Sequence, residues 1–223
     1  MGNFFTSSIG KKITMAAAGL FLILFLLVHL GINSLLIFFP DTDNFNIAAH
    51  FMGTNILIKV FEVVLFGGFL LHIIYGLVVQ VQNWFSRPVG YKVTNYSQTS
   101  FFSKFMIHTA AIIFVFLAIH LSDFYFKAKF FGEVTDVMIN GKEYHDLGSM
   151  VITKFQMEGF VIFYIASFLF LGFHLLHGFQ SAFQTLGIEH KKWTPVIKAT
   201  GKIYTFIVVA GFTAIPIVLY IIR

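Results

Sequence analysis

The sequence predicts an all-α integral membrane protein with five transmembrane helices. Of its 223 residues, 57% are hydrophobic and only 11% are charged, whereas a soluble domain is typically about 45–50% apolar and about 25% charged. Phe alone occurs 31 times, more than a small water-soluble core could bury. This composition excludes a soluble enzyme with a polar surface, and it excludes disorder, which requires few aromatic residues and high charge.

Cutting the chain at every Asp, Glu, Lys and Arg leaves five long uncharged segments. In chain order they are Ile13–Pro40, Val63–Ser86, Phe105–Ser122, Gly159–Ile188 and Ile203–Ile222. A transmembrane helix needs about 20 mostly apolar residues. The segments therefore predict a single transmembrane domain over residues 1–223, with helices at about 13–39, 56–84, 103–127, 156–184 and 196–222.

The regions between the helices offer little room for a catalytic domain. The next longest uncharged segment, Asn44–Ile58, has 15 residues and contains Asn, His and Gly, so we interpret it as loop. The other long loop, Lys127–Glu158, contains Asn140-Gly141, which predicts a small hairpin. Function is therefore expected within the membrane or with a partner.

Lysine and arginine are distributed unevenly between the two sides of the membrane. Five helices place the N-terminus and the loops after the second and fourth helices on one side. That side carries nine Lys or Arg residues and one acid, Glu189, whereas the other carries six Lys or Arg residues and nine acids. Since basic loops stay in the cytoplasm, we expect a cytoplasmic N-terminus and a C-terminus outside. The net charge of +5 then reflects orientation, and no nucleic-acid partner is expected.

Six histidines fall inside the predicted helices, where ionisable side chains are costly and usually functional. They are His29, His72, His108, His120, His174 and His177. The other three, His50, His145 and His190, fall in loops and are interpreted as solvated side chains.

Four of the six histidines sort into two pairs by depth. With a rise of about 1.5 Å per residue, His29 and His120 lie about 25 Å from the nearest inner charge on their helices, and His72 and His174 lie about 22 Å or less from theirs. The inner loops begin before those charges on the second and fourth helices. His29 and His120 are therefore expected in the outer half of the bundle, and His72 and His174 in the inner half.

Two imidazoles at one depth on two helices form the ligand set of a b-type haem, whose iron takes a neutral imidazole on each face. Gly76 and Gly178 each follow an inner histidine by four residues, on the same helix face, which leaves room for a flat ring. His108 and His177 fit helix–helix hydrogen bonding or a place at a haem edge. The chain has no Cys, which excludes iron–sulfur clusters and covalent c-type haem.

Four motifs follow one another along nearly the whole chain. They are Ser-Ile-Gly-Lys-Lys-Ile-Thr-Met-Ala-Ala-Ala-Gly with Val28-His29-Leu30, Leu71-His72-Ile-Ile-Tyr-Gly76, His108-Thr-Ala-Ala-Ile-Ile-Phe-Val-Phe-Leu-Ala-Ile-His120, and Phe173-His174-Leu-Leu-His-Gly178. This ordered set resembles the cytochrome b membrane anchor of succinate dehydrogenase and fumarate reductase, in its single-chain, five-helix, two-haem class.

The resemblance implies that the first four helices form a haem-binding bundle. His29 and His120 would hold the iron of an outer haem b, and His72 and His174 that of an inner haem b. The chain would pass electrons between an iron–sulfur subunit and membrane quinone, usually menaquinone, in a bacterial cytoplasmic membrane. A partner flavoprotein with covalent FAD would carry the dicarboxylate active site, so no catalytic residue is expected here. A dimer of the whole complex is left open.

Two features of the family are not matched here with certainty of position, a proton-transfer Glu and an acid at the quinone site. Some two-haem members carry a Glu, assigned to transmembrane proton transfer, two residues before the ligand in helix 4. Gly172 occupies that position here, so the proton route is not carried over. Asp41, Asp43 and Glu62 are outer acids that location alone makes candidates for a quinone site, and each is equally well interpreted as a solvated loop acid.

Two alternatives remain open from the sequence. The anchor of another quinone-linked enzyme, such as a formate dehydrogenase, hydrogenase or nitrate reductase, would share the haems and differ in its partner. A cofactor-free transporter or channel would instead use the histidines as a proton or metal relay. A cofactor-free transporter would show no visible absorption, unlike either haem-containing anchor. A co-purifying subunit with covalent flavin would distinguish the succinate dehydrogenase or fumarate reductase anchor from that of another quinone-linked enzyme.

Overall fold

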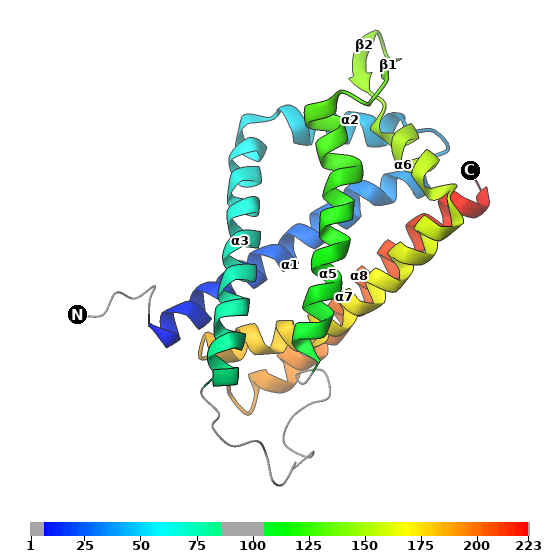
Figure 1. Cartoon of the computed structure of the whole chain (residues 1–223). Helices are drawn as coiled ribbons and strands as arrows, with labels where there is room; N and C mark the ends of the chain where they lie inside the picture. The colour runs from blue at the N-terminus through cyan, green and yellow to red at the C-terminus, as the bar shows by residue number, and fades with distance from the viewer. Residues whose placement is uncertain (1–6, 86–104, 223) are drawn as a thin grey trace.

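The computed structural model describes residues 7–85 and 105–222, which form a bundle of long helices (Figure 1). Within these ranges, five helices are long and apolar enough to cross a membrane. They are α1 (Ser8–Phe38), α3 (Ile56–Phe85), the span Met106–Phe131, α7 (Glu158–Thr185) and α8 (Trp193–Ile222). The predicted all-α class and its five apolar helices are thus confirmed. Each helix overlaps its predicted range, and the start predicted at residue 103 lies outside the described residues.

Short elements gather at one end of the bundle, drawn uppermost in Figure 1. They are α2 (Asp43–Thr54), β1 (Asp136–Ile139), β2 (Lys142–His145) and α6 (Leu147–Phe155). The hairpin predicted at Asn140-Gly141 is confirmed, since β1 and β2 pair antiparallel with Ile139 opposite Lys142. Asn140 and Gly141 have φ values of 52° and 79°, the left-handed pair that a two-residue type I′ turn requires.

The interpretation of Asn44–Ile58 as loop is wrong, because α2 occupies most of it and α3 begins at Ile56. Asn46, whose polarity argued for a loop, is 0% exposed. Its Nδ2 donates to Asp146 at 2.9 Å, and its Oδ1 accepts from the Gly148 N–H at 2.8 Å. Hydrogen bonds to α6 therefore compensate the burial of this amide. His50 also lies on α2 rather than in a loop.

The best-buried apolar side chains lie on α1 and α8, which pack with α7. Leu36, Val208 and Leu219 are at most 1% exposed. Helices α1 and α8 approach closely at Gly211, where an added Cβ would lie 2.8 Å from a methyl carbon of Leu30. This half of the bundle is therefore packed by the chain's own side chains.

Helix α3 is packed differently. None of its residues is buried, although it is strongly apolar. Its main neighbour is α1, which passes beside it in Figure 1. A helix in an aqueous bundle would bury one face against its neighbours. Among residues 7–85 and 105–222, side chains of this chain cover neither face of α3 completely.

The third span changes its helical type at one of the paired histidines. Helix α5 (Met106–His120) ends there, and η2 (Leu121–Phe131) continues as a π-helix up to Gly132, whose φ is 62°. The span therefore extends four residues beyond its predicted end at residue 127. π-Helical turns are rare in proteins, and those that do occur often lie at functional sites.

Candidate functional site

The structure brings His29 of α1 and His120 of α5 together. Their ring centroids are 5.7 Å apart, and the ring planes are at 90°. The His29 ring stacks on Phe25 at 5.2 Å and contacts Phe212 at 5.8 Å. On the other side, Nδ1 of His120 lies 3.2 Å from the hydroxyl of Tyr164. Contacts from α1, α7 and α8 thus hold this outer pair, and Nε2 of His120 is the ring nitrogen that Tyr164 does not engage.

His72 of α3 and His174 of α7 form the second pair. Their ring centroids are 6.1 Å apart, with the planes at 71°. Nδ1 of His72 lies 3.3 Å from the carbonyl oxygen of Met15. Nδ1 of His174 is buried and has no hydrogen-bond partner among the described residues. A buried polar atom of this kind carries a desolvation cost that a ligand could relieve.

The two pairs lie at different levels along α1. The inner pair is level with Gly19, where an added Cβ would lie 3.3 Å from Cε1 of His72. The outer pair includes His29 itself, ten residues further along. At about 1.5 Å per residue, these two positions are about 15 Å apart along the helix axis. The side chains are therefore paired and stacked as the depth argument predicts, whereas their role as ligands stays a prediction.

Each pair has the donor set of a metal held by two imidazoles. Imidazole nitrogens bind metals at about 2 Å, so two rings on opposite sides of one ion have centres roughly 6 Å apart, close to the observed 5.7 and 6.1 Å. Metal-binding histidines usually donate their other N–H to a carbonyl or similar acceptor. Met15 and Tyr164 offer such acceptors to His72 and His120. The residues present therefore fit a haem b in each pair.

A site for a metal with three or four protein ligands is a poorer fit. No group of three or more His, Asp or Glu side chains comes together in the described ranges, and such convergence is what a zinc site needs. Two facing imidazoles in an apolar bundle instead suit a haem, because the porphyrin supplies the other ligands of its iron.

Two glycines beside the inner pair border flexible side chains. A Cβ on Gly76 would lie 3.8 Å from the Met15 sulfur, and one on Gly178 would lie 3.7 Å from the Met106 methyl. Both are ordinary van der Waals distances to the mobile ends of methionines, which adapt to irregular spaces. The helix surface at these glycines can therefore admit a flat ring with little rearrangement.

The remaining intramembrane histidines stand apart from the two pairs. His108 is exposed near the start of α5, with its ring 5.8 Å from Phe105. His177 is half-buried on α7, three residues after His174. Neither ring belongs to the two pairs described above, and the choice of His174 over His177 as the ligand in helix 4 stays a prediction.

Of the three outer acids, Glu62 makes contacts that a solvated loop acid would lack. Its carboxylate accepts hydrogen bonds from the hydroxyl of Tyr125 and the ammonium of Lys129, both on η2. Within the described part of the chain, Asp41 accepts a local bond, from the N–H of Asp43 at 3.1 Å. The interaction joins α3 to η2 at the end of the bundle where α3 begins and η2 ends.

Several contact residues were not identified from the sequence. Tyr164 and Gly19 contact residues of other helices, and such contacts depend on which helix faces meet. The available signal for Tyr164 was a lone phenol hydroxyl in a Phe-rich helix, which needs a partner when buried. The signal for Tyr125 and Lys129 was their spacing of four residues, which suits a shared helix face.

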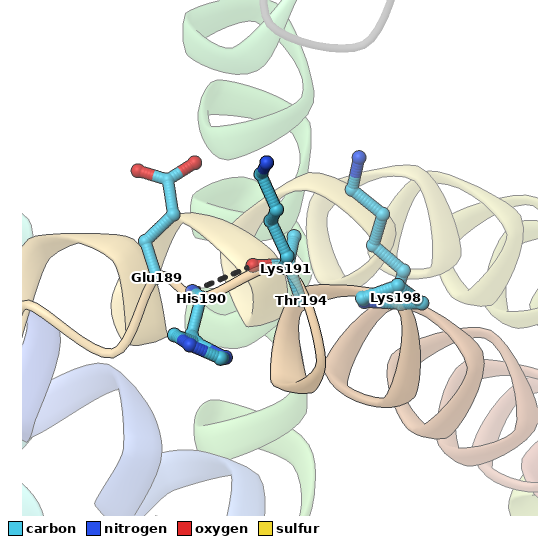
Figure 2. A pocket seen from close by; sticks show the side chains of 6 residues that line it. Glu189, His190, Lys191, Thr194 and Lys198 are labelled. Atoms are coloured by element: carbon cyan, nitrogen blue, oxygen red, sulfur yellow. Dashed lines mark hydrogen bonds between the residues drawn. The ribbon is translucent and has the colours of Figure 1, made fainter.

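A surface pocket of about 550 Å³ lies at the turn between α7 and α8 (Figure 2). Its lining residues are Glu189, His190, Lys191, Thr194, Pro195 and Lys198. The N–H of His190 donates to Oγ1 of Thr194 at 3.1 Å, closing the turn. The pocket is charged and includes none of the four paired histidines, so it is separate from both histidine pairs.

No family model, curated protein or solved structure matches the chain. The resemblance to cytochrome b anchors therefore stays a prediction from the motifs, and function is inferred below from the paired histidines.

Proposed function

We propose that the chain is a di-haem cytochrome b that anchors a succinate:quinone oxidoreductase in the membrane. The observation that carries the proposal is the arrangement of two facing histidine pairs, each joining two apolar helices and one stacked above the other. His29 and His120 would hold the outer haem, and His72 and His174 the inner haem. When bound, haem b supplies reversible one-electron redox chemistry, with a potential set by its axial ligands and surroundings.

The chain's own contribution is to hold and insulate these groups. Burial among apolar side chains keeps the imidazoles neutral, the form that binds iron. Backbone and side-chain acceptors fix the rings of His72 and His120. The incomplete coverage of α3 by protein is consistent with a cofactor against its inward face. The buried Nδ1 of His174 has no hydrogen-bond partner among the described residues, and a ligand at the inner pair could relieve its desolvation cost.

The partners follow from the same proposal. An iron–sulfur subunit and a flavoprotein with covalent FAD would dock on the cytoplasmic side, and menaquinone would exchange electrons from the membrane. The starts of α1 and α8 and the end of α7 would face that side. Lys11, Lys12, Lys191, Lys192 and Lys198 lie near those helix ends, and basic residues mark the cytoplasmic side of a membrane protein.

The test is a dithionite-reduced minus oxidised spectrum of the purified complex, with haem counted per chain. Two b-type haems per chain, both low-spin, are expected, together with a co-purifying subunit that carries covalent flavin. Two haems without such a flavin subunit would favour the anchor of another quinone-linked dehydrogenase. A single haem would show that one pair is misassigned.

Absence of haem from folded protein, made with an ample supply of haem, would reject electron transfer. The histidines would then be better explained as a proton or metal relay in a transporter. A His108→Ala variant serves as the matched control, because His108 lies in the same helix as His120 but outside both pairs. It is expected to retain both haems.

A further inference from the structure

We infer that Tyr164 is a positioning residue for the outer haem, which it tunes through its hydrogen bond to His120. The inference rests on the proposed function, since it concerns a haem held between His29 and His120. Tyr164 does not touch that haem in this scheme. It acts on the far nitrogen of the ligand ring.

The hydroxyl of Tyr164 is held in place by the packing around its ring. The residue is 2% exposed, and its oxygen lies 3.2 Å from Nδ1 of His120. Three phenyl rings surround its own ring, with centroids at 4.6 Å for Phe160, 5.0 Å for Phe116 and 5.2 Å for Phe155. A side chain walled in by rings from three helices cannot swing its hydroxyl away from His120.

This contact selects the nitrogen that binds iron. With iron on Nε2 of His120, Nδ1 would carry the ring's proton and donate it to the hydroxyl oxygen of Tyr164. A ligand imidazole whose N–H donates to an acceptor becomes more basic, and its ring orientation is fixed. Because greater electron donation favours the oxidised metal, the hydrogen bond lowers the potential of the outer haem.

The two haem sites differ in how this acceptor is supplied. His72 of the inner pair has the carbonyl oxygen of Met15, which no side-chain replacement removes. His120 of the outer pair has a side-chain hydroxyl, which replacement by Phe removes without changing the ring. The outer potential is therefore the one that a single conservative substitution can set independently.

The experiment compares Tyr164→Phe with the wild-type complex. Each haem is titrated by absorbance against potential, and the low-spin ferric signals are recorded by EPR. The outer haem is identified as the one that His120→Ala removes. Tyr164→Phe is expected to retain two haems, to raise the outer midpoint potential, to move the outer EPR signal, and to leave the inner haem unchanged.

Tyr204→Phe is the matched control. The Tyr204 hydroxyl is also buried and donates to the carbonyl oxygen of Ile23 at 2.7 Å, but it does not bond a histidine. Its removal is expected to shift neither potential. A second variant, Phe160→Leu, keeps the Tyr164 hydroxyl and loosens one wall of its cage, so it should raise the outer potential by less than Tyr164→Phe does.

Loss of the outer haem alone in Tyr164→Phe would also support the assignment. It would be overturned by unchanged potentials, by equal shifts of both haems, or by the same shift in Tyr204→Phe. These outcomes are distinct from failure of the proposed function, in which the wild-type complex itself would contain no haem.

Discussion

Gly19 of α1 lies directly against the imidazole ring of His72 of α3. A Cβ at Gly19 would stand 3.3 Å from Cε1 and 3.4 Å from Nδ1 of that ring. The first distance is tighter than ordinary van der Waals contact, and the second lies at its lower limit. The same ring atom Nδ1 lies 3.3 Å from the carbonyl oxygen of Met15, one turn earlier on α1. The small residue therefore lets His72 approach the backbone of α1 closely enough to use a main-chain acceptor.

We expect Gly19→Leu to displace His72 and to remove the inner haem while the outer haem is retained. The added side chain would occupy the space of the imidazole and break its contact with Met15. The measurement is the haem count per chain with the spectrum of the remaining haem. Gly31→Leu is the matched control, since a Cβ there would meet nothing within 4 Å. Two haems in Gly19→Leu would show that this contact does not position the ligand.

His72→Ala and His174→Ala are expected to remove the same haem. Their ring centroids are 6.1 Å apart, and either substitution would remove one of the two residues that would hold the inner haem. The other haem should keep most of its spectrum. His177→Ala should leave both haems in place, because His177 lies outside the pair. If His72→Ala and His174→Ala removed different haems, the assignment of these two residues to one haem would be wrong. If His177→Ala removed the inner haem, His177 rather than His174 would be the ligand in helix 4.

The histidine pairing was predictable because it depends on the number of residues between each histidine and the end of its helix. Helical rise is nearly constant, so counting residues from charged helix ends places His29 level with His120. The contact between Gly19 and His72 was not predictable in this way. It depends on which face of α1 meets α3, and small residues such as those at 16–19 serve packing at many positions in membrane helices.

The two departures from the predicted fold have different physical causes. Composition argued for a loop at α2, but burial of Asn46 with hydrogen bonds to Asp146 and Gly148 stabilises a helix there. The change from α-helix to π-helix after His120 has no counterpart in residue type, and the segment that follows, Leu121–Phe131, mixes aromatic and charged residues.

We expect Gly172→Val to destabilise the bundle by about 1–3 kcal/mol, the usual range for overpacking a core. A Cβ on Gly172 would lie 2.9 Å from Cγ2 of Val209, so α7 and α8 would have to separate. The free energy of unfolding in detergent is the measurement. Gly67→Val is the control, because a Cβ there meets nothing within 4 Å. An equal loss in both variants would show that membrane-helix propensity, rather than packing, sets the effect. The same crowding leaves no space for a glutamate side chain at this position.

The contact between α2 and α6 is expected to weaken at low pH. Burial raises the pKa of Asp146, but hydrogen bonds from Ser149, Asn46 and Thr42 outweigh it and hold the pKa below the usual 3.8. The carboxylate accepts from Asn46 at 2.9 Å and from the Ser149 N–H at 3.1 Å. A pKa lowered by folding contributes stability that is fully present above the ordinary aspartate pKa, and that is lost as pH falls through the lower folded value.

Hydrogen exchange of the Gly148 and Ser149 amides at a series of pH values, corrected for intrinsic exchange rates, measures this loss. Protection should be constant from neutral pH to about pH 5 and should fall below about pH 4, where the unfolded carboxylate takes up its proton. Asp146→Asn keeps an acceptor oxygen but cannot titrate, so its protection should start lower and change less over the same range. If the two proteins lose protection in parallel as pH falls, another group controls the contact and the role given to Asp146 is wrong.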